Sequence, residues 1–184
     1  GKVDQAMVIK GGNFPLLLPL LDQPCPVERM SAVYALGRNP CPSAVQKLVS
    51  LLKTDDNAYV RRATAWSLAN YDNQIVLEPL INALKNDVAA VRLWSSSSLA
   101  EIGNVSFENA QLAAEQLLIS LKIDNESGVR SNCIWSLCRL YEKLNNTFQE
   151  SFVDECTKIA LFDKEPSVME EAKTALDSMG MQGF

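Results

Sequence analysis

Five cysteines and a set of regularly spaced arginines are the residues of this 184-residue chain whose types could support chemistry. Thiolates hold iron–sulfur clusters, and arginines bind carboxylates. The sequence has no histidine. Because Ser–His and Cys–His catalysis and most zinc sites need that side chain, the sequence argues against a hydrolase or a metalloenzyme, and we expect no metal site.

The spacing of the cysteines gives little support to a metal cluster. The five are Cys25, Cys41, Cys133, Cys138 and Cys156, and none forms a C-x-x-C pair. Cys133 and Cys138 are five residues apart, which places them poorly for one face of a helix. We interpret all five as ordinary reduced thiols in a cytoplasmic protein, with a redox or metal-cluster adaptor as a third alternative.

The arginines belong to a ten-residue pattern that occurs five times, beginning at residues 28, 60, 91, 129 and 168. Aligned without gaps, the copies place a leucine at position nine and, in four copies, an arginine at position two. The leucines are Leu36, Leu68, Leu99, Leu137 and Leu176, and the arginines are Arg29, Arg61, Arg92 and Arg130. Successive leucines are 32, 31, 38 and 39 residues apart, a range typical of stacked helical repeats.

Positions one, five, eight and nine of the copies are mostly apolar or small, and they fall on one face of a helix. A second apolar helix is expected after each copy, over residues 43–52, 75–84, 107–121 and 148–161. We therefore predict an all-α fold, an α-solenoid of about five antiparallel helix pairs that forms a single domain over 1–184. Its expected parts are a partial unit at 1–24, repeats at about 25–55, 56–86, 87–124 and 125–163, and a capping helix at 164–180.

Two acidic residues, Asp56 and Asp87, each precede a repeated arginine by five residues. A short acidic side chain at that place can cap the following helix and face the arginines. We interpret these aspartates and the four arginines as a structural ladder.

Position seven carries the aromatic residues Tyr34, Trp66 and Trp135, at the margin of the expected core face. Two roles are open for them. They either fill the seam between neighbouring helix pairs, or they form a binding surface for a partner or a planar ligand. Trp94, at position four of its copy, is expected to be packed.

Charge and hydropathy argue against a nucleic-acid binder and against a membrane-spanning protein. The net charge of −5 argues against a nucleic-acid binder. The longest apolar run, residues 14–21, contains two prolines and is too short to cross a bilayer. Because the sequence begins at Gly1 rather than Met, we expect the native start upstream. The N-terminal end is apolar, and we expect a dimer to form through it.

The V-R-x-x-A-x-x-x-L pattern, the acidic turn and the second helix together resemble HEAT repeats. The resemblance is strongest to the class named for phycobilisome (phycobiliprotein) lyases. It rests on the segments DNAYVRRATAWSLANYDNQIVLEPLINAL (56–84) and DVAAVRLWSSSSLAEIG (87–103). It implies a right-handed, armadillo-like superhelix whose second helices line a concave groove, in a cytoplasmic, cyanobacterial protein.

The resemblance also implies a function, as a protein-binding subunit or chaperone in attaching linear tetrapyrroles (bilins) to phycobiliprotein cysteines. Its partner would be a phycobiliprotein subunit or a related HEAT chain, and a phycobilin would be a transferred ligand, not a permanent cofactor. The position-seven aromatics would cover the bilin rings, the arginines would bind its carboxylates, and Glu78, Asp56 or Asp87 would face its pyrrole nitrogens. The alternative is a non-catalytic scaffold that binds a protein through Gln46, Glu78 and Glu115 on the second helices.

Overall fold

The computed structural model describes residues 14–181, and every regular element in that range is a helix. Residues 1–13 of the expected partial unit at 1–24 lie outside the described residues. The chain divides into two compact units, unit 1 at 1–98 and unit 2 at 99–184, and the division falls within helix α6 (Ala89–Gly103). The prediction of a single domain over 1–184 stays a prediction.

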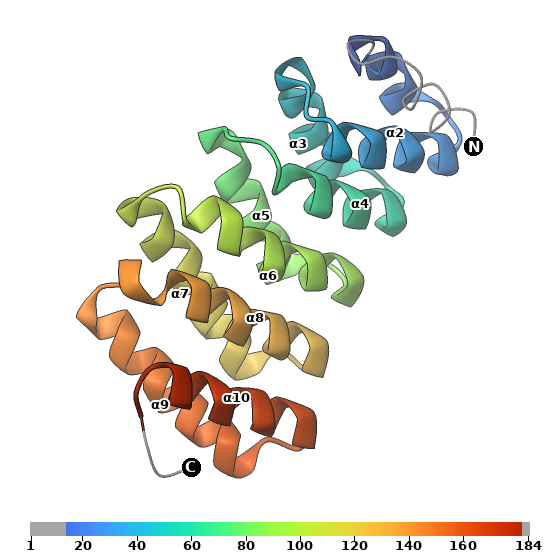
Figure 1. The fold of residues 1–184 in the computed structure, drawn as a ribbon. Helices are drawn as coiled ribbons and strands as arrows, with labels where there is room; N and C mark the ends of the chain where they lie inside the picture. The colour runs from blue at the N-terminus through green and yellow to red at the C-terminus, as the bar shows by residue number, and fades with distance from the viewer. Residues whose placement is uncertain (1–13, 182–184) are drawn as a thin grey trace. The chain divides into compact units, whose positions relative to one another are not determined.

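Unit 1 begins with a 3₁₀ helix, η1 (Phe14–Asp22), followed by α2 (Pro26–Arg38), α3 (Val45–Thr54), α4 (Ala58–Leu68) and α5 (Leu77–Asn86). Short 3₁₀ turns, η2 (Pro42–Ala44) and η3 (Gln74–Val76), lead into α3 and α5. Helix α2 packs beside α4, and α3 packs against both α4 and α5 (Figure 1). The helices with the repeated pattern, α2 and α4, are called the first helices below, and α3 and α5 the second helices.

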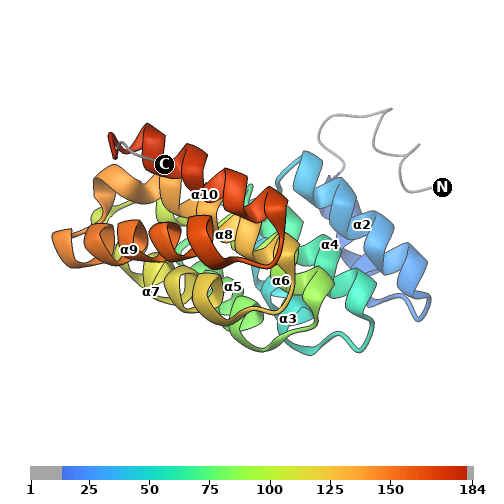
Figure 2. The same ribbon diagram turned by 90° about the horizontal axis from the view of Figure 1, so that it is seen from below.

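Unit 2 contains the end of α6, then α7 (Phe107–Ile123), α8 (Ser127–Leu140), the 3₁₀ turn η4 (Tyr141–Lys143), α9 (Asn146–Phe162) and α10 (Pro166–Ser178). The first helices α8 and α10 pack against each other, as do the second helices α7 and α9. Figure 2 shows α9 and α10 side by side. The second helices predicted at 43–52, 75–84, 107–121 and 148–161 therefore correspond to α3, α5, α7 and α9.

The repeated pattern builds the core. All five repeated leucines are completely buried, and the small residues at position eight are buried beside them. The hydroxyl of Ser98, at position eight, donates a hydrogen bond of 2.7 Å to the carbonyl oxygen of Ala65 on the neighbouring first helix. The two helices therefore approach each other closely at this position. A larger side chain would separate these two helices.

Polar residues in the turns fix where several helices begin. The side chain of Asn57 accepts hydrogen bonds from the backbone N–H groups of Tyr59 and Val60 at the start of α4. Ser106 and Asn145 cap α7 and α9 in the same manner. Each cap satisfies N–H groups that have no partner within the helix, so the turns of the repeat are defined by local sequence.

Tyr71, in the turn after α4, links two consecutive repeats. Its buried hydroxyl donates to the carbonyl oxygen of Leu36 (2.8 Å) and accepts from the backbone N–H of Cys41 (3.2 Å). Burial raises the pKa of this phenol, the hydrogen bond from Cys41 opposes that shift, and the Cys41 charge adds to it. The hydroxyl therefore serves the backbone at the end of α2, a role that the sequence pattern did not reveal.

Replacing Tyr71 with phenylalanine is expected to lower the free energy of unfolding by about 2 kcal/mol, because a buried carbonyl and a buried N–H group lose their partner. Urea denaturation measures the change. An effect below about 0.5 kcal/mol would mean that water replaces the hydroxyl.

Candidate functional site

Three of the four repeated arginines, Arg29, Arg61 and Arg130, bind the aspartate that follows the next second helix. Arg29 donates to both carboxylate oxygens of Asp55, at 2.9 and 3.0 Å. Arg61 makes the same two-point contact with Asp87, at 3.0 Å from both Nε and Nη2. In unit 2, Arg130 and Asp163 repeat the arrangement at 3.0 and 2.9 Å. We call these pairs the arginine–aspartate ladder. Two parallel hydrogen bonds of this kind fix orientation as well as charge.

Each guanidinium also holds the turn of its own repeat. Nη1 of Arg61 donates to the carbonyl oxygen of Asp55 at 2.8 Å, and Nη1 of Arg92 donates to that of Asp87 at 2.8 Å. Arg130 donates likewise to the carbonyl oxygen of Asp124 at 2.9 Å. One side chain therefore joins two consecutive turns.

The first rung of the ladder has two aspartates beside Arg29. The side chain of Asp55, which the sequence pattern did not single out, is 4% exposed and forms the two-point contact, whereas that of the predicted Asp56 is 96% exposed and forms a longer ion pair with Arg29 at 3.4 Å. The helix cap expected from Asp56 is supplied by Asn57. Asp87 does bind a repeated arginine, but this is Arg61 of the preceding copy, 26 residues earlier.

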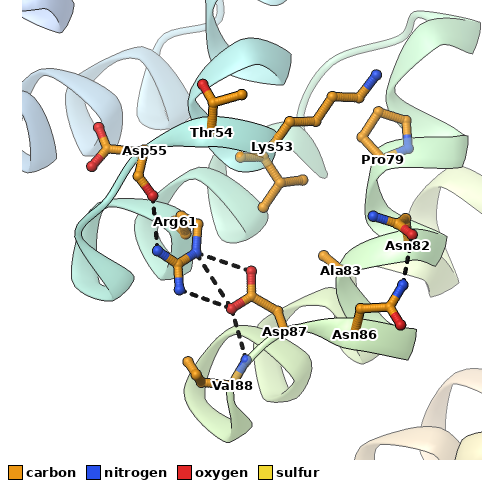
Figure 3. Close-up of a pocket in the computed structure, with 11 residues that line it drawn as sticks. Lys53, Thr54, Asp55, Arg61, Pro79, Asn82, Ala83, Asn86, Asp87 and Val88 are labelled. Carbon is orange, nitrogen blue, oxygen red and sulfur yellow. Dashed lines mark hydrogen bonds and ion pairs between the residues drawn. The ribbon is translucent and has the colours of Figure 1, made fainter.

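The Arg61–Asp87 rung lies in a groove of about 380 Å³ between α3 and α5. Figure 3 shows Arg61 lying between Asp55 and Asp87, with Asn82 and Asn86 hydrogen-bonded to each other nearby. The side chains of Arg61 and Asp87 bind each other, and Asp87 also accepts a hydrogen bond from the backbone N–H of Val88. We therefore interpret this groove as a structural link between two turns.

The position-seven aromatics have different surroundings in the two units. Tyr34 and Trp66 form a tilted pair with ring centroids 5.5 Å apart, at the α2–α4 contact. Trp135, in unit 2, is 48% exposed, and the guanidinium carbon of Arg139 lies 5.0 Å from its ring centroid. The first two aromatics therefore fill a seam, and Trp135 is the one available at the surface.

The remaining candidates lie apart from these groups. Glu78 is exposed in the first turn of α5, and it does not line the α3–α5 groove. Trp94 is exposed, so the expectation that it would be packed is wrong.

Burial raises the pKa of the thiols of Cys133 and Cys156, with nearby negative groups adding to the shift. Over residues 14–181, no cluster of three potential metal ligands occurs.

A groove of about 390 Å³, which the sequence pattern did not predict, lies between the second helices α7 and α9. We call it the α7–α9 groove. Its walls carry apolar groups, Ile119, Ile123 and Phe148, and acidic groups, Glu115 and Asp154, that stand exposed beside them. The carboxylate of Glu155 is nearly buried there and pairs with the ammonium groups of Lys122 (3.5 Å) and Lys158 (3.4 Å). The i, i+4 spacing of Ile119 and Ile123, which places both on one helix face, is the sequence feature that could have indicated this groove.

Charge is distributed unevenly between the two units. Residues 99–184 contain 14 acidic and seven basic side chains, a net charge of −7, whereas residues 1–98 contain eight acidic and ten basic ones, a net charge of +2. The modest charge of the whole chain conceals this asymmetry. Unit 2 therefore favours a basic partner.

No helix within the described part of the chain is both long and apolar enough to cross a membrane. A comparison with curated protein sequences finds no match.

Solved structures with similar folds are helical repeat proteins. One is a designed armadillo repeat protein in complex with the peptide (KR)4, at 20% identity and a TM-score of 0.68, covering 96% of this chain and 90% of that one. Another is the complex of CpcE and CpcF of phycocyanin lyase from Nostoc sp. PCC7120, at 22% identity and a TM-score of 0.67, covering 89% of this chain and 97% of that one. An engineered protein matches at 24% identity with a TM-score of 0.70, covering 98% and 85%.

The predicted fold class, an all-α solenoid of helix pairs, is confirmed by these likenesses. The family described as HEAT repeats matches residues 14–100 and 45–138, which together span about two thirds of the sequence. The chain belongs to the HEAT-repeat family.

Proposed function

We propose that this chain is a protein-binding module whose α7–α9 groove binds an apolar segment of a partner that also carries lysine or arginine. The observation that carries the proposal is a row of exposed apolar side chains. Ile119 and Ile123 line the groove, and Leu112 and Phe162 extend the same helix faces beyond it. Phe162 is 81% exposed. Single exposed apolar residues are ordinary on protein surfaces, but a row of them along a groove is typical of a binding surface.

Electrostatics support a basic partner. Glu115 and Asp154 lie exposed beside the apolar residues, in the unit that carries a net charge of −7. The two lysines that line the groove, Lys122 and Lys158, are already paired with Glu155. Lysine or arginine side chains of a partner would lie against these carboxylates while its apolar residues cover the isoleucines. The similar fold of a designed armadillo repeat protein that is in complex with a (KR)4 peptide is consistent with this type of partner.

Replacing both Ile119 and Ile123 with aspartate is expected to weaken partner binding at least about tenfold, because the apolar contact area is lost. The partner segment would be selected from a displayed library of random peptides and its affinity measured by calorimetry. We expect the selected peptides to combine apolar residues with lysine or arginine. The matched control is Val105→Asp, an exposed apolar position in the turn before α7.

Peptides that bind the double variant as tightly as the original chain would disprove this site. Because both isoleucines are exposed, thermal midpoints of the double variant and of the control should remain close to that of the original chain. Affinity should also decrease as the salt concentration rises, since the expected charge contacts are exposed.

A second candidate function is a role in bilin attachment, which the likeness to the CpcE–CpcF complex of phycocyanin lyase supports. In this proposal the partner is a phycobiliprotein subunit or a related HEAT chain, and a phycobilin is held transiently. Mixing the chain with phycocyanobilin, alone and with a related HEAT chain, tests it through the visible absorption band of the pigment. An unshifted band in both mixtures would exclude this role.

A further inference from the structure

A second groove, of about 500 Å³, lies between the first helices α8 and α10 of unit 2. We call it the α8–α10 groove. It is separate in position from the α7–α9 groove, because the two share no lining residue. Helix α8 contributes Trp135 and Cys138, and helix α10 contributes Glu170, Glu171 and Thr174.

The equivalent contact in unit 1, between α2 and α4, is filled by aromatic rings. Tyr34 of α2 and Trp66 of α4 pack together there, both at position seven of their copies. The indole of Trp66 lies directly over Gly37, at position ten, since a Cβ atom on that glycine would come within 2.4 Å of the ring. Glycine at position ten is therefore what admits the indole in unit 1.

The repeat register identifies what is missing in unit 2. Trp135 occupies the position of Tyr34, Cys138 occupies that of Gly37, and Thr174 occupies that of Trp66. All three line the α8–α10 groove. The groove therefore lies where unit 1 has an indole and unit 2 has a threonine side chain. An aromatic ring supplied from outside would restore the type of contact found in unit 1.

The rim of the groove is acidic. Glu171 accepts a hydrogen bond from the hydroxyl of Ser131 across the groove. Glu170 is exposed and pairs with Lys173 at 3.2 Å. Arg139, the cation beside Trp135, pairs with Glu101 at 3.1 Å and is not among the residues that line the groove. The charges that line the groove are thus carboxylates, in the unit with the strongly negative net charge.

We propose that the α8–α10 groove binds an aromatic side chain of a partner peptide that carries lysine or arginine next to it. The ring lies against Trp135 and Thr174, farther from the backbone of position ten than Trp66 lies in unit 1, because Cys138 has a side chain where Gly37 has none. The basic side chains face Glu170 and Glu171. This site is independent of the function proposed for the α7–α9 groove.

The test uses a defined probe, the pentapeptide Gly-Lys-Phe-Arg-Gly with both ends blocked. In a ¹H–¹⁵N spectrum the indole N–H peak of Trp135, assigned with Trp135→Phe, should shift on titration and saturate with a Kd of about 1 mM or below. The peak of Trp66, whose ring is already packed, should not move. A peptide with leucine in place of phenylalanine should bind about threefold to tenfold more weakly.

Two variants separate the contributions of shape and charge. Thr174→Trp supplies the missing ring from within the chain and should weaken binding of the probe at least about tenfold. The double change E170Q and E171Q should weaken binding about threefold and reduce its salt dependence, without relying on how the tryptophan packs. The α7–α9 variant with aspartate at positions 119 and 123 should bind the probe unchanged, so failure of either site is distinguishable from failure of the other.

Three results would overturn the proposal. The first is an unmoved Trp135 peak at about 5 mM peptide. The second is equal binding of the phenylalanine and leucine peptides, and the third is full binding by both Thr174→Trp and the glutamine double variant. Should Thr174→Trp lose its helical circular dichroism, the glutamine variant alone decides the outcome.

Discussion

Replacing Asp163 with alanine is expected to lower the free energy of unfolding by about 3 kcal/mol. The side chains of Asp163 and Arg130 are each only 7% exposed, so Arg130 would keep its charge in a buried site without its carboxylate partner. Urea denaturation followed by tryptophan fluorescence measures the change, and Trp135 reports on unit 2. The matched control is Asp56→Ala, which removes a 96% exposed carboxylate and should change stability by less than about 0.5 kcal/mol.

The stabilisation by Asp163 should also depend on pH. Burial opposes ionisation of this carboxyl, but hydrogen bonds from Arg130 and from the backbone N–H of Glu165, with the charges of Arg130 and Lys164, outweigh burial and lower its pKa. A lowered pKa in the folded state gives stability that is complete above the unfolded pKa of about 3.9 and is lost as the pH falls through the folded value. The difference between the original chain and Asp163→Ala should therefore narrow in acid. A constant difference from pH 7 to about pH 2 would contradict this assignment.

Replacing Leu137 with alanine is expected to lower the free energy of unfolding by about 3 kcal/mol, through lost burial and the cavity left in the core of unit 2. Leu137 is completely buried at position nine of α8. Leu161→Ala, at an exposed position on α9, is the control and should change stability by less than about 0.5 kcal/mol. Equal effects of the two changes would show that position nine does not form the core. Urea denaturation of both variants makes the comparison.

The core could be predicted because burial follows a local period. Leucines repeated in register with small residues beside them require one face of a helix to be covered, whatever the partner is. The ladder was harder to assign, because two aspartates adjoin in the turn at 55 and 56 and only one faces inward. The spacing of 26 residues that joins Arg29 to Asp55 and Arg61 to Asp87 was the available signal. The corresponding spacing from Arg130 to Asp163 is 33 residues, so length variation in unit 2 concealed the rule.

The surface features could not be predicted in the same way. Tyr34, Trp66 and Trp135 share one sequence position, yet the first two are packed together and the third lies at a groove. What separates them is the size of the residue opposite, Trp66 for Tyr34 and Thr174 for Trp135. That residue belongs to the next repeat, so it acts only once the helices are stacked. The groove between α7 and α9 also depends on two helices, and neither sequence segment alone reveals it.

Because Arg29, Arg61 and Arg130 each contact their own turn and the next one, the arginine–aspartate ladder affects how this chain can change length during evolution. A duplicated block of residues 56–87 would bring its own Arg61 and Asp87. Asp55 would still bind Arg29, and each new arginine would have an aspartate 26 residues ahead, so the ladder itself would need no compensating change. In the last copy Met169 stands where the arginine would be, which ends the series at that point. The ladder is therefore compatible with the gain or loss of whole repeats. An insertion within a turn, by contrast, would move an aspartate away from its arginine.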